Sequence, residues 1–138
     1  MDVKNVLLPS TTSSQYTCYL PNILRDVHRV EVLFANYIVS GTPVYLDIEE
    51  LRSPVYNMTA TLNSGDSTTK YSSFAVLPET TAGVYTTQQY PIVIDYPCPI
   101  GRVDKLTVTW SDETGTPIVT GGAKMSALLR FFTKRNRV

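Results

Sequence analysis

The stretch VHRVEVLFANYIVSGTPVYLDIEEL, residues 27–51, decides the fold. Its second half, from Val44 to Leu51, alternates apolar and polar side chains, which is the period of a strand with one buried face. Ser-Gly-Thr-Pro at residues 40–43 precedes it, and these residue types suit a turn because glycine permits positive φ and proline fixes φ. The stretch therefore predicts two strands joined by a turn.

The segment before this turn allows two interpretations. Five of its apolar residues lie at helical spacing: Ile23, Val27, Val30, Phe34 and Tyr37. A helix over Asn22–Tyr37 is therefore an alternative. However, Val30, Val32 and Phe34 also alternate with the residues between them, the segment is rich in β-branched and aromatic residues, and it lacks a cap followed by a clear amphipathic stripe. A strand is the favoured interpretation.

Short apolar or alternating segments recur along the rest of the chain, separated by turn clusters such as residues 97–101. We expect eight strands, at residues 3–8, 15–20, 28–38, 44–51, 71–77, 88–96, 105–111 and 124–132. Because strands and helices do not alternate, the pattern predicts an all-β sandwich or closed barrel. The polar segment 52–70 is the longest expected loop. Pro91 lies in an expected strand and predicts an edge or a bulge there, because it cannot donate to the ladder.

The last expected strand is apolar on both faces, so it should be central in a sheet or covered by a partner. The 138 residues predict one domain, 1–138. We expect residues 1–13 to be an N-terminal arm, either flexible or folded as the first strand, and residues 133–138 to be a basic tail.

Charge and hydropathy exclude several classes of function. Twelve basic side chains balance twelve acidic ones, so no overall field attracts the chain to nucleic acid or to an anionic membrane. The apolar run near the start is too short for a secretory signal, and none reaches the length of a transmembrane span. We expect a soluble product without membrane insertion.

The residues that usually carry chemistry are sparse. Cys18 and Cys98 fit no metal or redox spacing and are expected to be buried, reduced thiols. His28 is the only histidine, and it has no carboxylate or thiol partner at a meaningful spacing, so a surface or packing role is expected. No catalytic or phosphate-binding motif is present. We predict a protein that is not an enzyme and has no cofactor or metal.

Acidic residues cluster at Asp47, Glu49 and Glu50. On a regular strand Asp47 and Glu49 would share a face about 7 Å apart, where they could hold calcium or act as acid and base. A solvated outer face, left for solvent or a basic neighbour, explains them more simply. Asp112–Thr116 also carries calcium-compatible oxygens but is better explained as a hairpin turn.

The basic tail could touch phosphate, but so few contacts give weak, salt-sensitive attachment. A solvated terminus, or an arm ordered against an acidic neighbour, suits it better. The nine tyrosines could form a platform for sugars or single strands, but sheet faces and subunit interfaces suit them better without a basic groove. Our candidate interface residues are Asp47, Glu49, Tyr90, Lys134, Arg135 and Arg137.

Two segments, YLDIEEL at residues 45–51 and VDKLTVTW at residues 103–110, stand out in the order of the expected strands. With LRDVHRVEV at residues 24–32 before them and SFAVL at residues 73–77 between them, this order resembles the small single jelly-roll capsid proteins of large icosahedral double-stranded DNA viruses. The resemblance is to the penton, or vertex, protein in particular. It covers most of the chain from about Gln15 onward and includes no diagnostic motif.

The resemblance implies an eight-stranded single jelly-roll β-sandwich, five copies of which close a fivefold vertex of the virion. The implied partners are copies of the chain, the major capsid protein and minor capsid proteins, with synthesis in the host cytoplasm and no specific nucleic acid. The family carries no catalytic residues. A minor or cement capsid protein between capsomers is an alternative, as is a jelly-roll carbohydrate-binding module. A cupin-type enzyme is the weakest alternative, since cupin metal sites usually need several histidines.

Overall fold

The computed structural model describes residues 2–37, 43–52, 59–61, 68–70, 74–77, 83–87, 91–112, 116–119 and 122–134. These residues form nine strands and one short 3-10 helix, and none of them lies in an α-helix. In chain order the elements are β1 (Asp2–Leu7), β2 (Gln15–Asn36), β3 (Val44–Ile48), η1 (Glu49–Leu51), β4 (Thr59–Thr61), β5 (Thr68–Lys70), β6 (Ala75–Leu77), β7 (Val84–Thr86), β8 (Ile92–Ser111) and β9 (Ser126–Thr133). The all-β prediction is confirmed.

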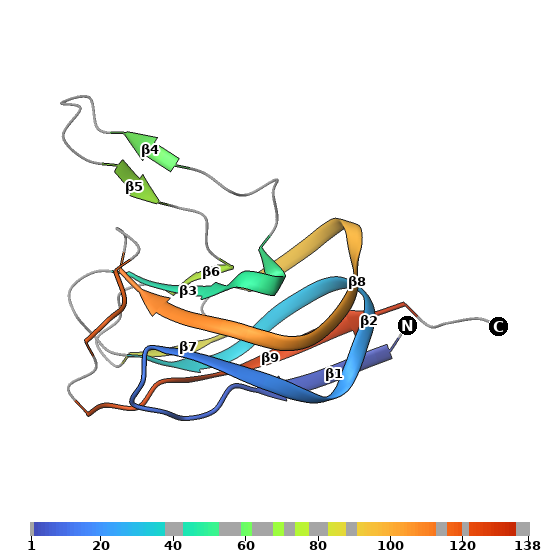
Figure 1. Cartoon of the computed structure of the whole chain (residues 1–138), viewed down its shortest axis with the longest axis horizontal. Coiled ribbons are helices and arrows are strands. Elements are labelled where there is room, and N and C mark those ends of the chain that lie inside the picture. The colour runs from blue at the N-terminus through green and yellow to red at the C-terminus, as the bar shows by residue number, and fades with distance from the viewer. Residues whose placement is uncertain are drawn as a thin grey trace.

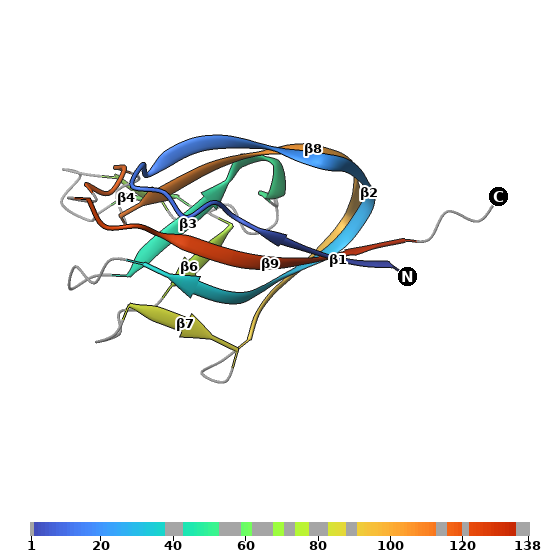
Figure 2. The same ribbon diagram turned by 90° about the horizontal axis from the view of Figure 1, so that it is seen from below.

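Seven strands form one curled sheet, whose paired strands are antiparallel, in the order β1-β9-β2-β8-β3-β6, with β7 also paired to β2. β4 and β5 form a separate pair. The long strands β2 and β8 are paired through most of their length. Both bend back on themselves at the end of the molecule where β1 begins and β9 ends (Figures 1 and 2). The first half of β2, the last half of β8, β3 and β6 make one layer. The second half of β2, the first half of β8, β1, β7 and β9 make the other.

β-Bulges account for this curl. The pairing of β2 with β8 shifts register between Tyr19 and Leu24 and again between Val27 and Arg29, and Asp26 has a positive φ of 54°. A bulge bends its strand and increases the local twist. In β8 the ladder skips residues 96–99, so the missing N–H groups of the two prolines there interrupt no regular pairing.

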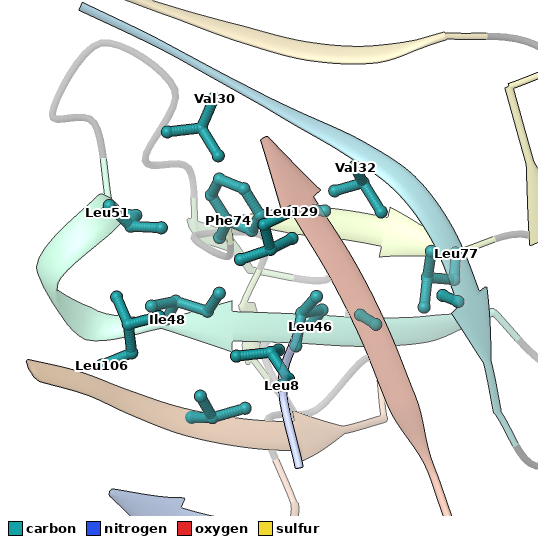
Figure 3. Packing of buried hydrophobic residues seen from close by; sticks show 14 of the residues in the cluster. Leu8, Val30, Val32, Leu46, Ile48, Leu51, Phe74, Leu77, Leu106 and Leu129 are labelled. Carbon is teal, nitrogen blue, oxygen red and sulfur yellow. The ribbon is translucent and has the colours of Figure 1, made fainter. Parts of the chain in front are cut away.

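The two layers enclose one hydrophobic core. Figure 3 shows side chains of β2 and β9 facing those of β3 and β8, among them Val30, Val32, Leu129, Leu46, Ile48 and Leu106. Trp110, Tyr85 and Phe131 are the largest side chains that are fully buried. Burying an aliphatic or aromatic side chain of this size contributes about 1.5–3 kcal/mol, so this core is the main support of the fold.

Several expected boundaries were wrong. Residues 15–20 and 28–38 were expected as two strands, and so were 88–96 and 105–111. Residues 15–36 instead form one long strand, β2, and residues 92–111 form another, β8, while residues 38 and 88–90 lie outside the described residues. The turn expected at 97–101 therefore lies inside β8, because a bulged bend uses the same Pro and Gly residues as a turn. Pro91 directly precedes β8 and does not interrupt a strand.

The regions around β3 and β7 also differ from expectation. β3 ends at Ile48, and residues 49–51 form η1 in place of a longer strand. β4 and β5 lie within the expected loop 52–70, and β7 was not predicted. Short strands of this kind carry too few apolar residues for their period to stand out.

The choice of strand over helix for residues 22–37 is confirmed for β2, and the bulges explain the helical spacing. The buried residues run Leu24, Val27, Val30, Val32 and Ala35. Each step of three marks a place where the strand changes phase, at or beside a register shift. A two-residue period with inserted residues thus imitates a helical one.

β9 confirms the expectation of a central strand, because it pairs with β1 on one side and β2 on the other. β1, from residues 2–7 of the expected arm, is an edge strand of the sheet. Residues 135–138 of the expected tail lie outside the described residues. Within the described part of the chain, no helix is long and apolar enough to span a bilayer.

Candidate functional site

The acidic cluster lies at the end of β3 and in η1, and most of it is bound within the chain. The Arg52 guanidinium donates two hydrogen bonds to the Asp47 carboxylate, and these bonds are the main cause that raises the pKa of Arg52. Glu50 accepts hydrogen bonds from the Thr107 backbone N–H at 2.6 Å and from the Thr107 hydroxyl at 2.7 Å. Glu49 is exposed.

This geometry changes the expected role of the cluster. Asp47 and Glu49 do not share one strand face, because the strand ends between them and η1 begins at Glu49. Asp47 is already paired with Arg52, and no group of metal-ligating side chains was found in the described part of the chain. Glu49 is therefore the carboxylate of this cluster with the greatest access to a partner. Its role at an interface stays a prediction.

Asp112 and Thr116 behave as the turn interpretation expects. The Thr116 N–H donates to the Asp112 carboxylate at 3.0 Å, and the Asp112 N–H donates to the Thr116 carbonyl at 3.0 Å. Such local bonds stabilise a reversal of the chain.

Among the other candidate interface residues, Lys134 is the described one. Its side chain is exposed, and its backbone N–H donates to the Asp26 carbonyl at 3.1 Å. This bond attaches the end of β9 to the bend of β2. Tyr90, Arg135 and Arg137 lie outside the described residues, so their roles also stay predictions.

His28 packs on the outer side of the layer that contains β1, β7 and β9. It is half-buried, and its ring centroid lies 6.5 Å from that of Phe132. Its buried Nδ1 has no hydrogen-bond partner among the described residues. Next to it, Arg29 lies over the Phe132 ring at 5.8 Å and pairs with Asp95 at 2.7 Å. A packing role, one of the two expected, fits this position.

Both cysteines are free, but they differ in exposure. Cys18 is half-buried, its thiol donates to the Leu106 carbonyl at 3.7 Å, and burial raises its pKa. Cys98 is exposed, so the expectation that both thiols are buried was wrong. It lies in the part of β8 that the ladder with β2 skips.

One side of the sandwich is open. Among the described residues, β1 pairs only with β9, and residues 15–19 of β2 pair only with β8. In the described part of the chain, seven large hydrophobic side chains are exposed, and four of them belong to β1 and the first half of β2: Val3, Leu7, Tyr19 and Ile23. Tyr19 is 77% exposed and Leu7 67%. Unpaired strand edges and exposed apolar side chains are both features of surfaces that bind a partner.

A pocket of about 150 Å³ lies at this open side, between β1 and the bend of β2. Lys4 and Val6 line it from β1, and Leu20 and Leu24 line it from β2. Val6 and Leu20 also pack against the core, so the pocket lies beside the edge of the core. This side could not be predicted from the sequence, because its residues become neighbours only when β2 bends. The local signal in the sequence was Tyr19, a large side chain at an exposed position of an alternating strand.

The chain matches no protein-family model, and no curated protein was found to be similar to it.

Proposed function

We propose that the chain is a structural capsid subunit, the penton, five copies of which close a fivefold vertex of an icosahedral virion. The curled two-layer sheet would be a single jelly roll in this proposal. The observation that carries it is the open side, where two strand edges, four exposed hydrophobic side chains and a pocket lie together. A surface of this kind loses its exposed apolar area when a neighbouring subunit covers it.

The two ends of the sheet support a ring. β1 and β6 are the terminal strands of the sheet order, and they differ in length, sequence and exposure. Contacts between unlike surfaces are head-to-tail, and they close into a ring when the rotation per subunit allows it. A stable contact of this type buries on the order of 1,000 Å² or more. β1 with the bend of β2 would supply one of the two surfaces.

The remaining parts of the proposal follow from a vertex position. The pentamer would contact the major capsid protein and minor capsid proteins at its rim, in the virion, after synthesis in the host cytoplasm. It would need no cofactor and catalyse no reaction. The near-zero net charge leaves little self-repulsion between copies.

Native mass spectrometry of the purified chain tests this function. We expect a closed five-copy species across a tenfold range of protein concentration. A chain that stays monomeric and also fails to bind capsomers would contradict the proposal, while a monomer that binds between capsomers would assign the cement role. Calcium-dependent sugar binding on a glycan array would replace the capsid function with that of a carbohydrate-binding module.

A further inference from the structure

The outer face of the bend in β2 and β8 carries basic and apolar side chains together. We call it the bend face and define it by Tyr19, Ile23, Arg25, Arg102 and Lys105. Arg25 lies directly opposite Arg102 in the ladder, and Tyr19 lies opposite Lys105, so each pair shares one side of the sheet. All five residues are exposed.

The opposed arginines are unfavourable for the isolated chain. Like charges directly opposite each other on neighbouring strands destabilise a sheet. Asp104 lies 3.6 Å from Arg102, but both side chains are more than half exposed, and such a surface pair contributes little. The fold therefore gains nothing evident from placing Arg25 opposite Arg102. An acidic partner would turn this repulsion into attraction.

The apolar members suit a protein partner. Tyr19 is 77% exposed and Ile23 42%, and Ile23 also lines the pocket at the open side. Tyrosine and arginine dominate the residues that carry binding energy at protein interfaces. Guanidinium groups bind carboxylates through paired hydrogen bonds. The chemistry of the bend face thus fits a surface that presents carboxylates.

The chain itself presents such a surface at η1. Glu49 is exposed there, and the cluster holds three carboxylates, those of Asp47, Glu49 and Glu50, for one guanidinium, that of Arg52. Asp47 and Glu50 are held by bonds within the chain. Glu49 can therefore bind outward while its neighbours keep η1 in place.

We propose that the bend face of one copy binds the acidic η1 of the next copy, with Arg25 and Arg102 holding Glu49. This inference rests on the proposed self-assembly and names the contact that drives it. The two surfaces are unlike, so the contact is head-to-tail and can close a ring. The opposite charges also set the register and speed the encounter between copies.

Charge reversal tests the contact, with sedimentation velocity as the measurement. Arg102→Glu should weaken assembly at least about 10-fold, as expected for a lost charge pair in a contact. Lys124→Glu is the matched control. Lys124 is also exposed, but it lies just before the start of β9, and it is the other end of β9 that reaches the bend. Glu49→Arg should weaken assembly similarly, and the Arg102→Glu/Glu49→Arg double variant should recover most of it. Arg25→Glu gives a second reading if Arg102→Glu does not fold.

The outcomes separate the two proposals. A wild-type chain that never assembles contradicts the proposed penton function itself. A wild-type chain that assembles, with Arg102→Glu and Arg25→Glu no weaker than Lys124→Glu, overturns the bend-face contact and leaves the capsid function standing. Failure of the double variant to recover assembly overturns the pairing with Glu49.

Discussion

The acidic cluster and the bend face both carry several charged side chains, but these side chains are bonded within the chain to different extents. At η1, Asp47 is bound by Arg52 and Glu50 by Thr107, so these charges hold the turn against the sheet. At the bend, Arg25 and Arg102 oppose each other on the surface. Asp47 and Glu50 therefore serve the fold, whereas Arg25 and Arg102, like Glu49, are the residues that we propose for a contact.

The tyrosines of the two regions show the same contrast. Tyr96 is buried, and its hydroxyl donates to the carbonyl of Leu51 at the end of η1. Tyr19, on the bend face, has most of its surface exposed. A side chain that anchors the fold is buried with its polar atom bound, and a side chain available to a partner is not.

The largest expected effect comes from the core beneath both regions. Phe131 is fully buried, whereas the next residue, Phe132, lies half-buried on the outer face with Arg29 over its ring. Phe131→Ala should lower the free energy of unfolding by about 3–5 kcal/mol, and Phe132→Ala by less than about 1.5 kcal/mol. Urea unfolding of both variants measures this. Equal losses would contradict the assignment of inner and outer faces.

Removal of Glu50 should have the next largest effect. Glu50→Ala deletes the acceptor of two hydrogen bonds from Thr107 and should lower the free energy of unfolding by about 1–3 kcal/mol, since two partly buried donors lose their charged acceptor. Glu49→Ala is the control, and it should change the free energy of unfolding of the dissociated chain by less than about 0.5 kcal/mol. Urea unfolding at low protein concentration compares them. A larger loss for Glu49→Ala would reverse the roles given to the two carboxylates.

Alkaline pH should weaken the fold through its buried phenols. Burial raises the pKa of Tyr96, and it also raises those of Tyr16 and Tyr85. Below about pH 10 these groups are neutral in both states. Above it, the unfolded chain releases protons that the folded chain retains, so the free energy of unfolding falls as pH rises.

Tyr96→Phe tests the phenol whose pKa is raised most. It should cost about 1 kcal/mol at pH 7, because the hydrogen bond to Leu51 is lost, and it should reduce the fall in stability between pH 10 and pH 11. Urea unfolding across that pH range is the measurement. A variant with the same slope as the wild-type chain would show that Tyr96 does not carry the alkaline effect.

The smallest effect on the fold is expected at the bend face. Arg25→Ala or Arg102→Ala in the dissociated chain should change the free energy of unfolding by less than about 0.5 kcal/mol, with a slight gain because a like-charge pair is removed. Thermal unfolding at low protein concentration measures the change. A loss above about 1 kcal/mol would mean that these arginines serve the fold after all.

Regular strands with one buried face were predictable from the sequence. Val44, Leu46 and Ile48 are fully buried as their alternation predicts, and the two-sided apolar pattern of β9 matches its central place. In both segments the local period and the tertiary environment agree. Neither prediction needed information from distant parts of the chain.

The bend was not predictable, because its local signals are ambiguous. Residues 97–101 have the composition of a turn, and only pairing with β2 makes them part of one long strand. The acidic cluster was found, but Glu50 and Thr107 lie 57 residues apart. Arg25 and Arg102 are likewise distant in sequence, so no local pattern marks them as neighbours.

A reconstruction of the assembled chain by electron cryo-microscopy would show the contact between copies. We expect five copies around a closed axis, with Arg25 and Arg102 of each copy inside the contact and facing Glu49 of the next. A particle whose contacts leave the bend face open to solvent, or a chain that yields only single copies, would contradict it.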